Sequence, residues 1–111
     1  MTFQTNAQAD LNSLKEIQDK IAIKHVVDTF SILADTKEID KQVLLFTEDG
    51  VVESKVNGQS TLLKGRQQLL QAFSGFLSNF HIVYHQNGQQ TIELNGDTAN
   101  ATSYLSSDFN R

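Results

Sequence analysis

Two histidines, His81 and His85, stand four residues apart in the segment "HIVYHQNGQQTIELNGDTANATSY". The segment alternates between apolar and polar residues, which predicts a half-buried strand with both histidines on one face. An imidazole changes its charge near neutral pH, so it can accept or donate a proton during a reaction. Two interpretations stay open: the histidines line a pocket and move protons, or they are ordinary polar residues on a solvated sheet face.

Metal and nucleophile chemistry find little support in the sequence. Each residue of a strand advances about 3.3 Å, so His81 and His85 are too far apart to share a metal ion easily. The chain contains no cysteine, which removes disulfides, thiol nucleophiles and thiolate metal sites. The glycines in "VNGQS" and "NGD" predict turns and not a phosphate-binding loop. We therefore expect neither a metal ion nor a cofactor.

Charge and hydropathy exclude other classes of partner. The net charge is −4, the lysines are scattered, and Arg66 and Arg111 are the only arginines. A nucleic-acid site or a membrane-surface helix needs concentrated positive charge, so we expect neither partner. No apolar run is long enough to span a bilayer, and the first residues do not resemble a signal peptide. We expect a cytoplasmic protein.

Helices dominate the first two thirds of the chain. Residues 1–10 are polar, and we expect them to be a flexible N-terminus ahead of a single domain over residues 11–111. A helix is predicted from Leu11 to about Ala34 by apolar residues at three- and four-residue spacing. The break "DTKEID" precedes a short second helix, "KQVLLF", with Asp40 as its expected N-cap. A third helix is predicted from Arg66 to Leu77.

Three Asn-Gly dipeptides lie between or within the predicted strands. Asn57-Gly58 and Asn95-Gly96 predict hairpin turns. Asn87-Gly88 is either a third turn or a bulge within one long bent strand, and we favour the bulge. Strands are predicted from Phe80 to the end of the chain. Early helices and late strands predict an α+β fold, with helices packed on one face of a curved antiparallel sheet.

Three segments in this order resemble a known family. They are "IKHVVDTFSILADTKEIDKQVLLFTEDGVVES", "LKGRQQLLQAF" and "HQNGQQTIELNGDTANATSYL". From about Ile17 to Leu105 the chain resembles the SnoaL-like branch of the nuclear transport factor 2-like superfamily. The resemblance implies a cone-shaped α+β barrel, in which helices and a strongly curved antiparallel sheet enclose an apolar cavity. The family's last strands would follow Leu105, so the resemblance also implies that this chain lacks them.

The resemblance implies a catalytic pair, because family members include dehydratases, ketosteroid isomerases, epoxide hydrolases and polyketide cyclases. Asp35 matches an aspartate at the end of the first helix in scytalone dehydratase-like members, and His85 matches their strand histidine. A carboxylate beside a histidine fixes its tautomer and prepares it for proton transfer. The second histidine and the tyrosine of those dehydratases correspond to about Ser103 and to Ala34.

Each residue of the pair also has a structural interpretation. Asp35 falls away from the main apolar stripe on a helical wheel, so only a bend near "DTKEID" would turn it inward. It is otherwise a solvated residue at a helix end. His85 is otherwise a hydrogen-bonded strand residue without a role in catalysis.

A pocket and a dimer complete the expectations. Side chains expected to line an apolar cavity, with solid core as the alternative, are Phe30, Phe46, Phe73, Phe76, His81, Val83 and Ser103. The opposite face of the strand then carries Phe80, Ile82 and Tyr84, and related proteins commonly dimerise through that face, so we expect a homodimer. Two functions remain: a cofactor-independent lyase, isomerase or cyclase acting on a small hydrophobic molecule, or a non-catalytic module for hydrophobic-ligand binding or dimerisation.

Overall fold

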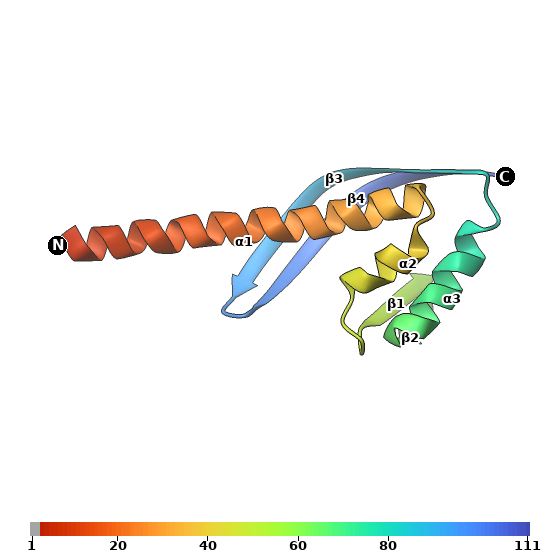
Figure 1. Ribbon diagram of the computed structural model, residues 1–111, viewed down its shortest axis with the longest axis horizontal. Helices are drawn as coiled ribbons and strands as arrows, with labels where there is room; N and C mark the ends of the chain where they lie inside the picture. The colour runs from red at the N-terminus through yellow and green to blue at the C-terminus, as the bar shows by residue number, and fades with distance from the viewer. Residues whose placement is uncertain (1–2) are drawn as a thin grey trace.

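The long first helix, α1 (Phe3–Asp35), shapes the whole molecule. The computed structural model describes the backbone of residues 3–111 and the side chains of residues 8–111. α1 contains neither glycine nor proline, which allows it to run unbroken, and it starts well before the boundary expected at Leu11. Its N-terminal half extends past the other elements and makes the molecule elongated, 62 × 29 × 26 Å (Figure 1). Within residues 3–111, no helix combines the length and the apolar character that crossing a membrane requires.

A tight turn ends α1 and leads directly into the next helix. Lys37 takes the left-handed conformation, with φ 58°, and the N–H groups of Lys37 and Glu38 donate to the carbonyls of Ala34 and Leu33. This is the Schellman arrangement that closes many helices. α2 (Ile39–Gln42) follows at once, with Glu38 at its N-cap, and continues as the 3₁₀ turn η1 (Val43–Leu45). The expectation that Asp40 caps this helix was wrong, because the turn after α1 starts α2 earlier.

The first hairpin and the third helix follow the sequence-based expectation. β1 (Val51–Val56) and β2 (Gln59–Lys64) pair antiparallel around Asn57 and Gly58. Both turn residues have positive φ, 52° and 78°, as a two-residue hairpin turn requires. α3 (Gly65–Leu77) begins where the Gly65 N–H donates to the Gly50 carbonyl at 2.8 Å. That bond ties the start of the helix to the start of the hairpin.

The second hairpin is long and bent. β3 (Ile82–Asn95) pairs antiparallel with β4 (Thr98–Asn110), and the register shifts between Asn87 and Gln90. The shift confirms the bulge predicted at Asn87-Gly88, and the turn confirms the hairpin predicted at Asn95-Gly96. Because of the bulge, the face of β3 that points toward α1 carries His85 and Asn87 before it and Gln90 after it.

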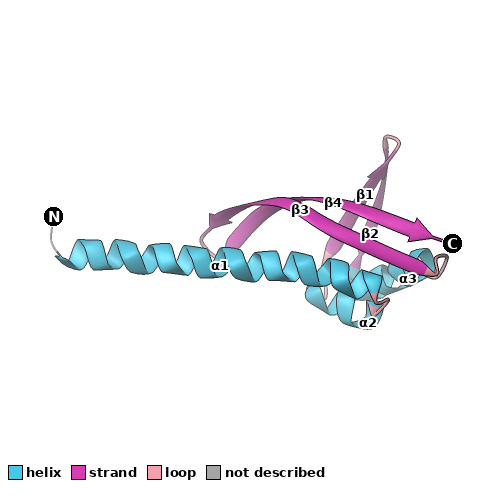
Figure 2. Cartoon of the chain, turned by 90° about the horizontal axis from the view of Figure 1, so that it is seen from above, coloured by secondary structure: helices cyan, strands magenta, loops and turns pink. Residues whose placement is uncertain are grey.

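The α+β class is confirmed, whereas the closed cone is not. The described strands form two separate two-stranded sheets, β1–β2 and β3–β4, which Figure 2 shows as distinct ribbons. A barrel needs every strand to pair on both edges, and here each strand pairs on one edge only. The helices gather on one side of β3–β4, where α1 runs beside β3 (Figures 1 and 2).

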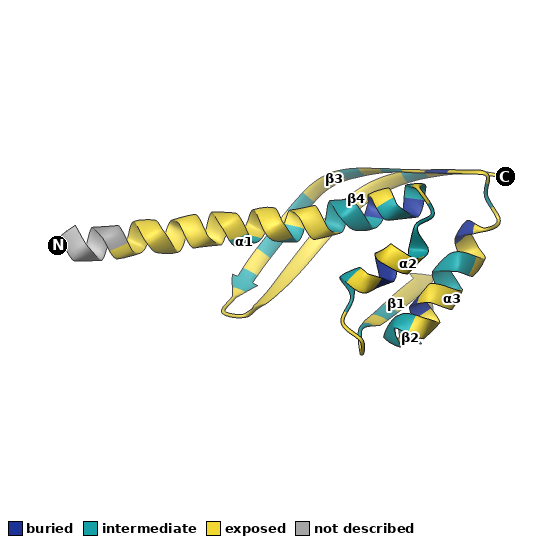
Figure 3. Ribbon diagram, in the orientation of Figure 1, coloured by how far each residue is buried: buried dark blue, intermediate teal, exposed yellow. Residues whose placement is uncertain are grey.

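The core lies at the C-terminal end of α1, as Figure 3 shows. Ala34, Leu77 and Val83 form its centre. Ile39, Phe80 and Phe109 pack around them, so α1, α3 and the open end of the second hairpin share one cluster. The described part of the first half of α1 and nearly all of β4 are exposed. The positions that could do chemistry therefore concentrate where α1 meets the start of β3.

Candidate functional site

Asp35, the last residue of α1, holds His85 of β3 through two contacts. The Asp35 Oδ1 and the His85 Nδ1 lie 2.6 Å apart, and the backbone N–H of His85 donates to the Asp35 Oδ2 at 3.1 Å. The side chains are 23% and 13% exposed, so water reaches the pair only in part. When Nδ1 donates to the carboxylate, Nε2 of the neutral ring is left as an acceptor. The arrangement can bind a substrate proton and return it.

No bend in α1 is needed to bring Asp35 to this position. Asp28, Ser31 and Asp35 lie at helical spacing on one side of α1, and all three bind β3. The strand lies along the polar side of the helix, which the helical wheel had assigned to solvent. Beyond the helix end, the ammonium of Lys37 donates to the Phe80 carbonyl just before β3 begins. The turn after α1 and the start of β3 are thus held together beside the Asp35–His85 pair.

A second polar cluster fixes the bulge of β3. The Asp28 Oδ1 accepts from the side-chain amides of Asn87 at 2.8 Å and Gln90 at 3.0 Å, while Ser31 donates to the Asn87 Oδ1 at 2.9 Å. Lys24, one turn earlier on α1, forms an ion pair with the Asp28 carboxylate at 2.5 Å. Hydrogen bonds from Lys24 and then Asn87 hold the pKa of Asp28 below its usual value, although burial acts in the opposite direction. These bonds set the register of β3 two residues beyond His85.

An apolar pocket of about 130 Å³ opens beside His85. It is lined by Phe30, Ala34, Gln42, Phe73, Phe76, Leu77, His85 and Phe109. The Phe109 ring meets the His85 ring edge-on, with centroids 5.7 Å apart, and the Phe76 ring at 5.3 Å. The pocket thus combines aromatic walls with one imidazole and one amide. Of the expected lining residues, the structure brings Phe30, Phe73 and Phe76 together here.

Four other expected lining residues lie elsewhere. Phe46 contacts the rings of Phe30 and Phe73 but is not part of the pocket wall. Val83 is buried in the core cluster. His81 is exposed in the bend before β3, and Ser103 is exposed on β4 opposite Gln90. His81 lies outside the pocket because β3 starts one residue after it, and Ser103 lies outside because it pairs with Gln90 beyond the bulge, whereas the pocket reaches β3 only at His85.

Phe109 and Gln42 were missed by the sequence analysis. Phe109 pairs with Val83 in the hairpin and therefore shares its inward face. Counting back from the Asn95-Gly96 turn indicates this only when the one-residue shift at the Asn87-Gly88 bulge is included, because the unshifted register pairs Phe109 with Tyr84 on the outer face. Gln42 stands in the short segment "KQVLLF" and gave no signal beyond being its uncharged polar residue.

The predicted dimer face also needs one correction. Ile82 and Tyr84 are 61% and 54% exposed on the outer face of β3. Phe80, in contrast, precedes the strand and packs against Phe76 and Phe109, with centroids 5.3 and 5.0 Å away. It belongs to the core, because the chain turns inward between α3 and β3.

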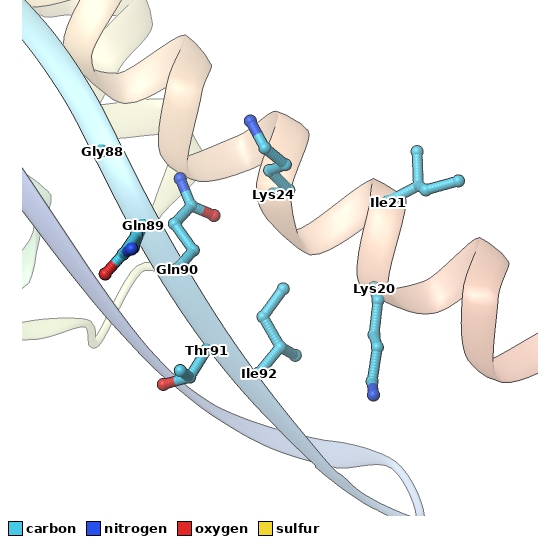
Figure 4. A pocket seen from close by; sticks show the side chains of 8 residues that line it. All are labelled: Lys20, Ile21, Lys24, Gly88, Gln89, Gln90, Thr91 and Ile92. Atoms are coloured by element: carbon cyan, nitrogen blue, oxygen red, sulfur yellow. The ribbon is translucent and has the colours of Figure 1, made fainter.

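A larger and more polar groove lies between α1 and β3, beyond the bulge. Its volume is about 600 Å³, and Figure 4 shows Lys20, Ile21 and Lys24 on the helix side and Gln90 and Ile92 on the strand side. Within residues 8–111 no three histidine, aspartate or glutamate side chains gather as a metal site would require. The Asp35–His85 pair lies beside the smaller pocket, and neither of its residues lines this groove.

Comparisons with known proteins agree with this fold. Residues 15–107 match the model of the SnoaL-like domain family. Uncharacterised proteins of Mycobacterium tuberculosis and Mycobacterium bovis are 28% identical over 90 residues, which cover 80% of this chain. The aligned region spans 59% of those mycobacterial relatives, so they are considerably longer.

Solved structures show the same architecture. A protein from Novosphingobium aromaticivorans, described as a candidate scytalone dehydratase, superposes with a TM-score of 0.76 at 21% identity over 88% of this chain and 64% of its own. A nuclear transport factor 2-like protein with a cystatin-like fold from the same organism superposes with a TM-score of 0.70 at 26% identity. The match covers 100% of this chain and 70% of that protein. A protein of unknown function from Nostoc punctiforme superposes with a TM-score of 0.70 at 26% identity. The match covers 85% of this chain and 71% of that protein. With the family match over most of its length, the chain belongs to the SnoaL-like domain family of the nuclear transport factor 2-like superfamily.

Proposed function

We propose that this protein is a cofactor-independent lyase, isomerase or cyclase that moves a proton on a small hydrophobic molecule. The observation that carries the proposal is the 2.6 Å contact between Asp35 and His85 at the wall of an aromatic pocket. His85 is the proton-transfer group, and Asp35 orients its ring. The hydrophobic substrate lies against the phenylalanine rings of the same pocket.

The chemistry follows from the two ring nitrogens. Asp35 holds Nδ1, so Nε2 accepts a proton from a C–H group that a neighbouring carbonyl makes acidic. The imidazolium that forms is stabilised by the carboxylate beside it. In an isomerisation the ring returns the proton to another carbon of the substrate. In a dehydration it protonates a β-hydroxyl, the C–O bond breaks, a C=C bond forms and water leaves.

Both the pocket and the relatives support this proposal. Six of the eight lining residues are apolar, and contact with apolar side chains strengthens the electrostatic contacts of a developing charge. The Novosphingobium structure described as a candidate scytalone dehydratase shares the fold, and dehydration is one of the reactions that an Asp–His pair can perform. That likeness concerns the fold, and the substrate class proposed here rests on the aromatic pocket beside His85.

A non-catalytic binding module is the second candidate. The position that matches the second histidine of scytalone dehydratase-like members is Ser103, which is exposed on β4 and lies outside the pocket. The position of their tyrosine is Ala34, which is buried in the core. The pocket thus contains one proton-transfer group where those enzymes use several, and such a pocket can bind a hydrophobic molecule without changing it.

Hydrogen exchange into a simple ketone tests the proposal without knowledge of the natural substrate. Cyclohexanone is incubated with the protein in D₂O, and NMR follows deuterium entering the carbon next to the carbonyl. We expect catalysed exchange that falls by about 100-fold or more in His85→Gln, as for loss of a general base. Asp35→Asn should also slow exchange, because its amide can donate to Nδ1 and leave Nε2 protonated.

His81→Gln is the matched control, because His81 is exposed outside the pocket and its loss should leave the exchange rate unchanged. Cyclohexanone that binds but exchanges at the buffer rate in every protein would reject catalysis and favour the binding module.

A further inference from the structure

Gln42 is the most deeply buried polar side chain of the pocket. It ends α2 and is 2% exposed. Its Nε2 donates to the Phe30 carbonyl at 3.0 Å, which fixes the orientation of the amide. Among the described residues, none donates a hydrogen bond to its Oε1. A buried acceptor without a donor is unfavourable and is rare in folded proteins, so this oxygen needs an explanation.

The surroundings of Gln42 indicate what could satisfy its oxygen. Apart from Gln42 and His85, every residue that lines the pocket is apolar. None of these neighbours donates a hydrogen bond to Oε1 in the structure, so a molecule inside the pocket can supply the missing donor. The hydrogen bond from Nε2 to the Phe30 carbonyl holds the amide in place, so such a molecule has to approach Oε1 with the amide in this orientation.

We propose that Gln42 is a specificity-determining residue whose Oε1 accepts a hydrogen bond from a hydroxyl group of the pocket's ligand. The inference rests on the pocket of the proposed function and defines its ligand class. A cavity of about 150 Å³ accommodates benzene, so a pocket of about 130 Å³ fits a molecule with one ring. The ligand is therefore a one-ring hydroxy compound, with its ring against Phe73 and Phe76 and its hydroxyl at Gln42.

Selectivity follows from the same geometry. A pocket built to bind a hydroxyl discriminates against the analogue that lacks it, because that analogue leaves the buried acceptor unpaired. His85 Nε2 is a second acceptor in the pocket, so a preference for hydroxyl compounds alone does not identify Gln42. The preference must depend on the side chain at position 42.

The test compares phenol with toluene, which differ in a hydroxyl and a methyl group on the same ring. Affinities are measured by NMR titration of the intact protein and of Gln42→Met, which keeps the size of the side chain and removes the acceptor. We expect phenol to bind the unchanged protein about tenfold more tightly than toluene, the effect of one hydrogen bond. In Gln42→Met the preference should fall to about threefold or less. Toluene binding should persist there, which also shows that the variant folds.

A measurement on the unchanged protein covers the case in which Gln42→Met does not fold. The side-chain amide resonances of Gln42 should shift when phenol is added and stay in place when toluene is added. Equal affinities for the two probes, or a phenol preference that survives in Gln42→Met, would overturn the inference. Binding of neither probe would reject the pocket itself. A phenol preference without deuterium exchange into cyclohexanone would uphold the role of Gln42 and reject catalysis alone.

Discussion

Asp28 shows how one carboxylate can organise a strand. Its oxygens accept hydrogen bonds from Lys24, Asn87 and Gln90, and these bonds hold its pKa below the usual value. The folded state therefore releases the proton of Asp28 more readily than the unfolded chain does. The resulting stabilisation is complete above the unfolded pKa of about 3.9 and is lost as the pH falls through the lower folded value.

Asp28→Asn should lower the free energy of unfolding by about 1 kcal/mol at pH 7, because the amide cannot accept all of these bonds. Urea unfolding of both proteins from pH 7 down to pH 3 checks the expectation. The difference in the free energy of unfolding between the two proteins should shrink as the pH falls below the pKa of Asp28 in the unfolded chain. Glu38, whose pKa is also lowered, is present in both proteins and cancels. Asp10→Asn, at an exposed position of α1, is the control, and a difference that ignores pH would contradict the assignment.

At the same scale, sequence reasoning identified Asp35 and His85 through the family resemblance but misjudged how they meet. It treated the apolar stripe of α1 as the inward side, since apolar burial is the usual rule. The structure instead places Asp28, Ser31 and Asp35 against β3. Polar residues at helical spacing were visible in the sequence. Their partners on β3 could not be assigned, because these contacts join residues fifty or more positions apart.

At the scale of elements, Gly75 and Gly88 allow a comparison of the same substitution at an open position and at a crowded one. Gly75 is an exposed residue of α3 with open space where a Cβ would lie, whereas a Cβ on Gly88 would lie 3.2 Å from the Tyr104 carbonyl oxygen. Gly75→Ala should raise the free energy of unfolding by about 0.5–1 kcal/mol. Gly88→Ala should lower it by about 1 kcal/mol, because the contact strains the bulge. Chemical denaturation of both variants provides the measurement, and the opposite order of stabilities would contradict the role of Gly88.

Local chemistry explains which elements were predictable. The turns at Asn57-Gly58 and Asn95-Gly96 and the helix α3 were predicted correctly, because neighbouring residues determine them. The bulge at Asn87-Gly88, which we favoured over a turn, also has a local signal in the same dipeptide. The start of α2 was misplaced, because it depends on how the chain leaves α1 through the left-handed Lys37.

At the scale of the molecule, the closed cone that the family resemblance implied is not confirmed. Alternation and Asn-Gly turns establish that strands exist and which neighbours pair. They do not establish whether distant strands meet, and the two hairpins here stay separate. Ser103 was expected in the pocket because its position matches the second histidine of scytalone dehydratase-like members, and in this open arrangement it lies on β4 outside the pocket.

We predict that two copies of the chain form a homodimer through the outer face of the second hairpin. Ile82 and Tyr84 are exposed side by side on β3, and a contact between copies would bury them. We expect light scattering at micromolar concentration to give twice the mass of one chain, and Tyr84→Asp to give the mass of a monomer. Leu14→Ser removes an exposed apolar side chain from α1 and is the control. A monomer before any substitution, or dissociation by Leu14→Ser alone, would contradict the predicted interface.

The two hydrogen-bond contacts between Asp35 and His85 have a consequence for how the residue at position 85 can vary in this family. One carboxylate oxygen binds the His85 ring and the other binds the backbone N–H of the same residue. The backbone bond does not depend on which side chain stands at position 85. The scaffold can therefore keep its helix–strand anchor while the chemical group at that position is exchanged. Such a position lets new reactivities be sampled, by evolution or in a mutant library, without first giving up the fold.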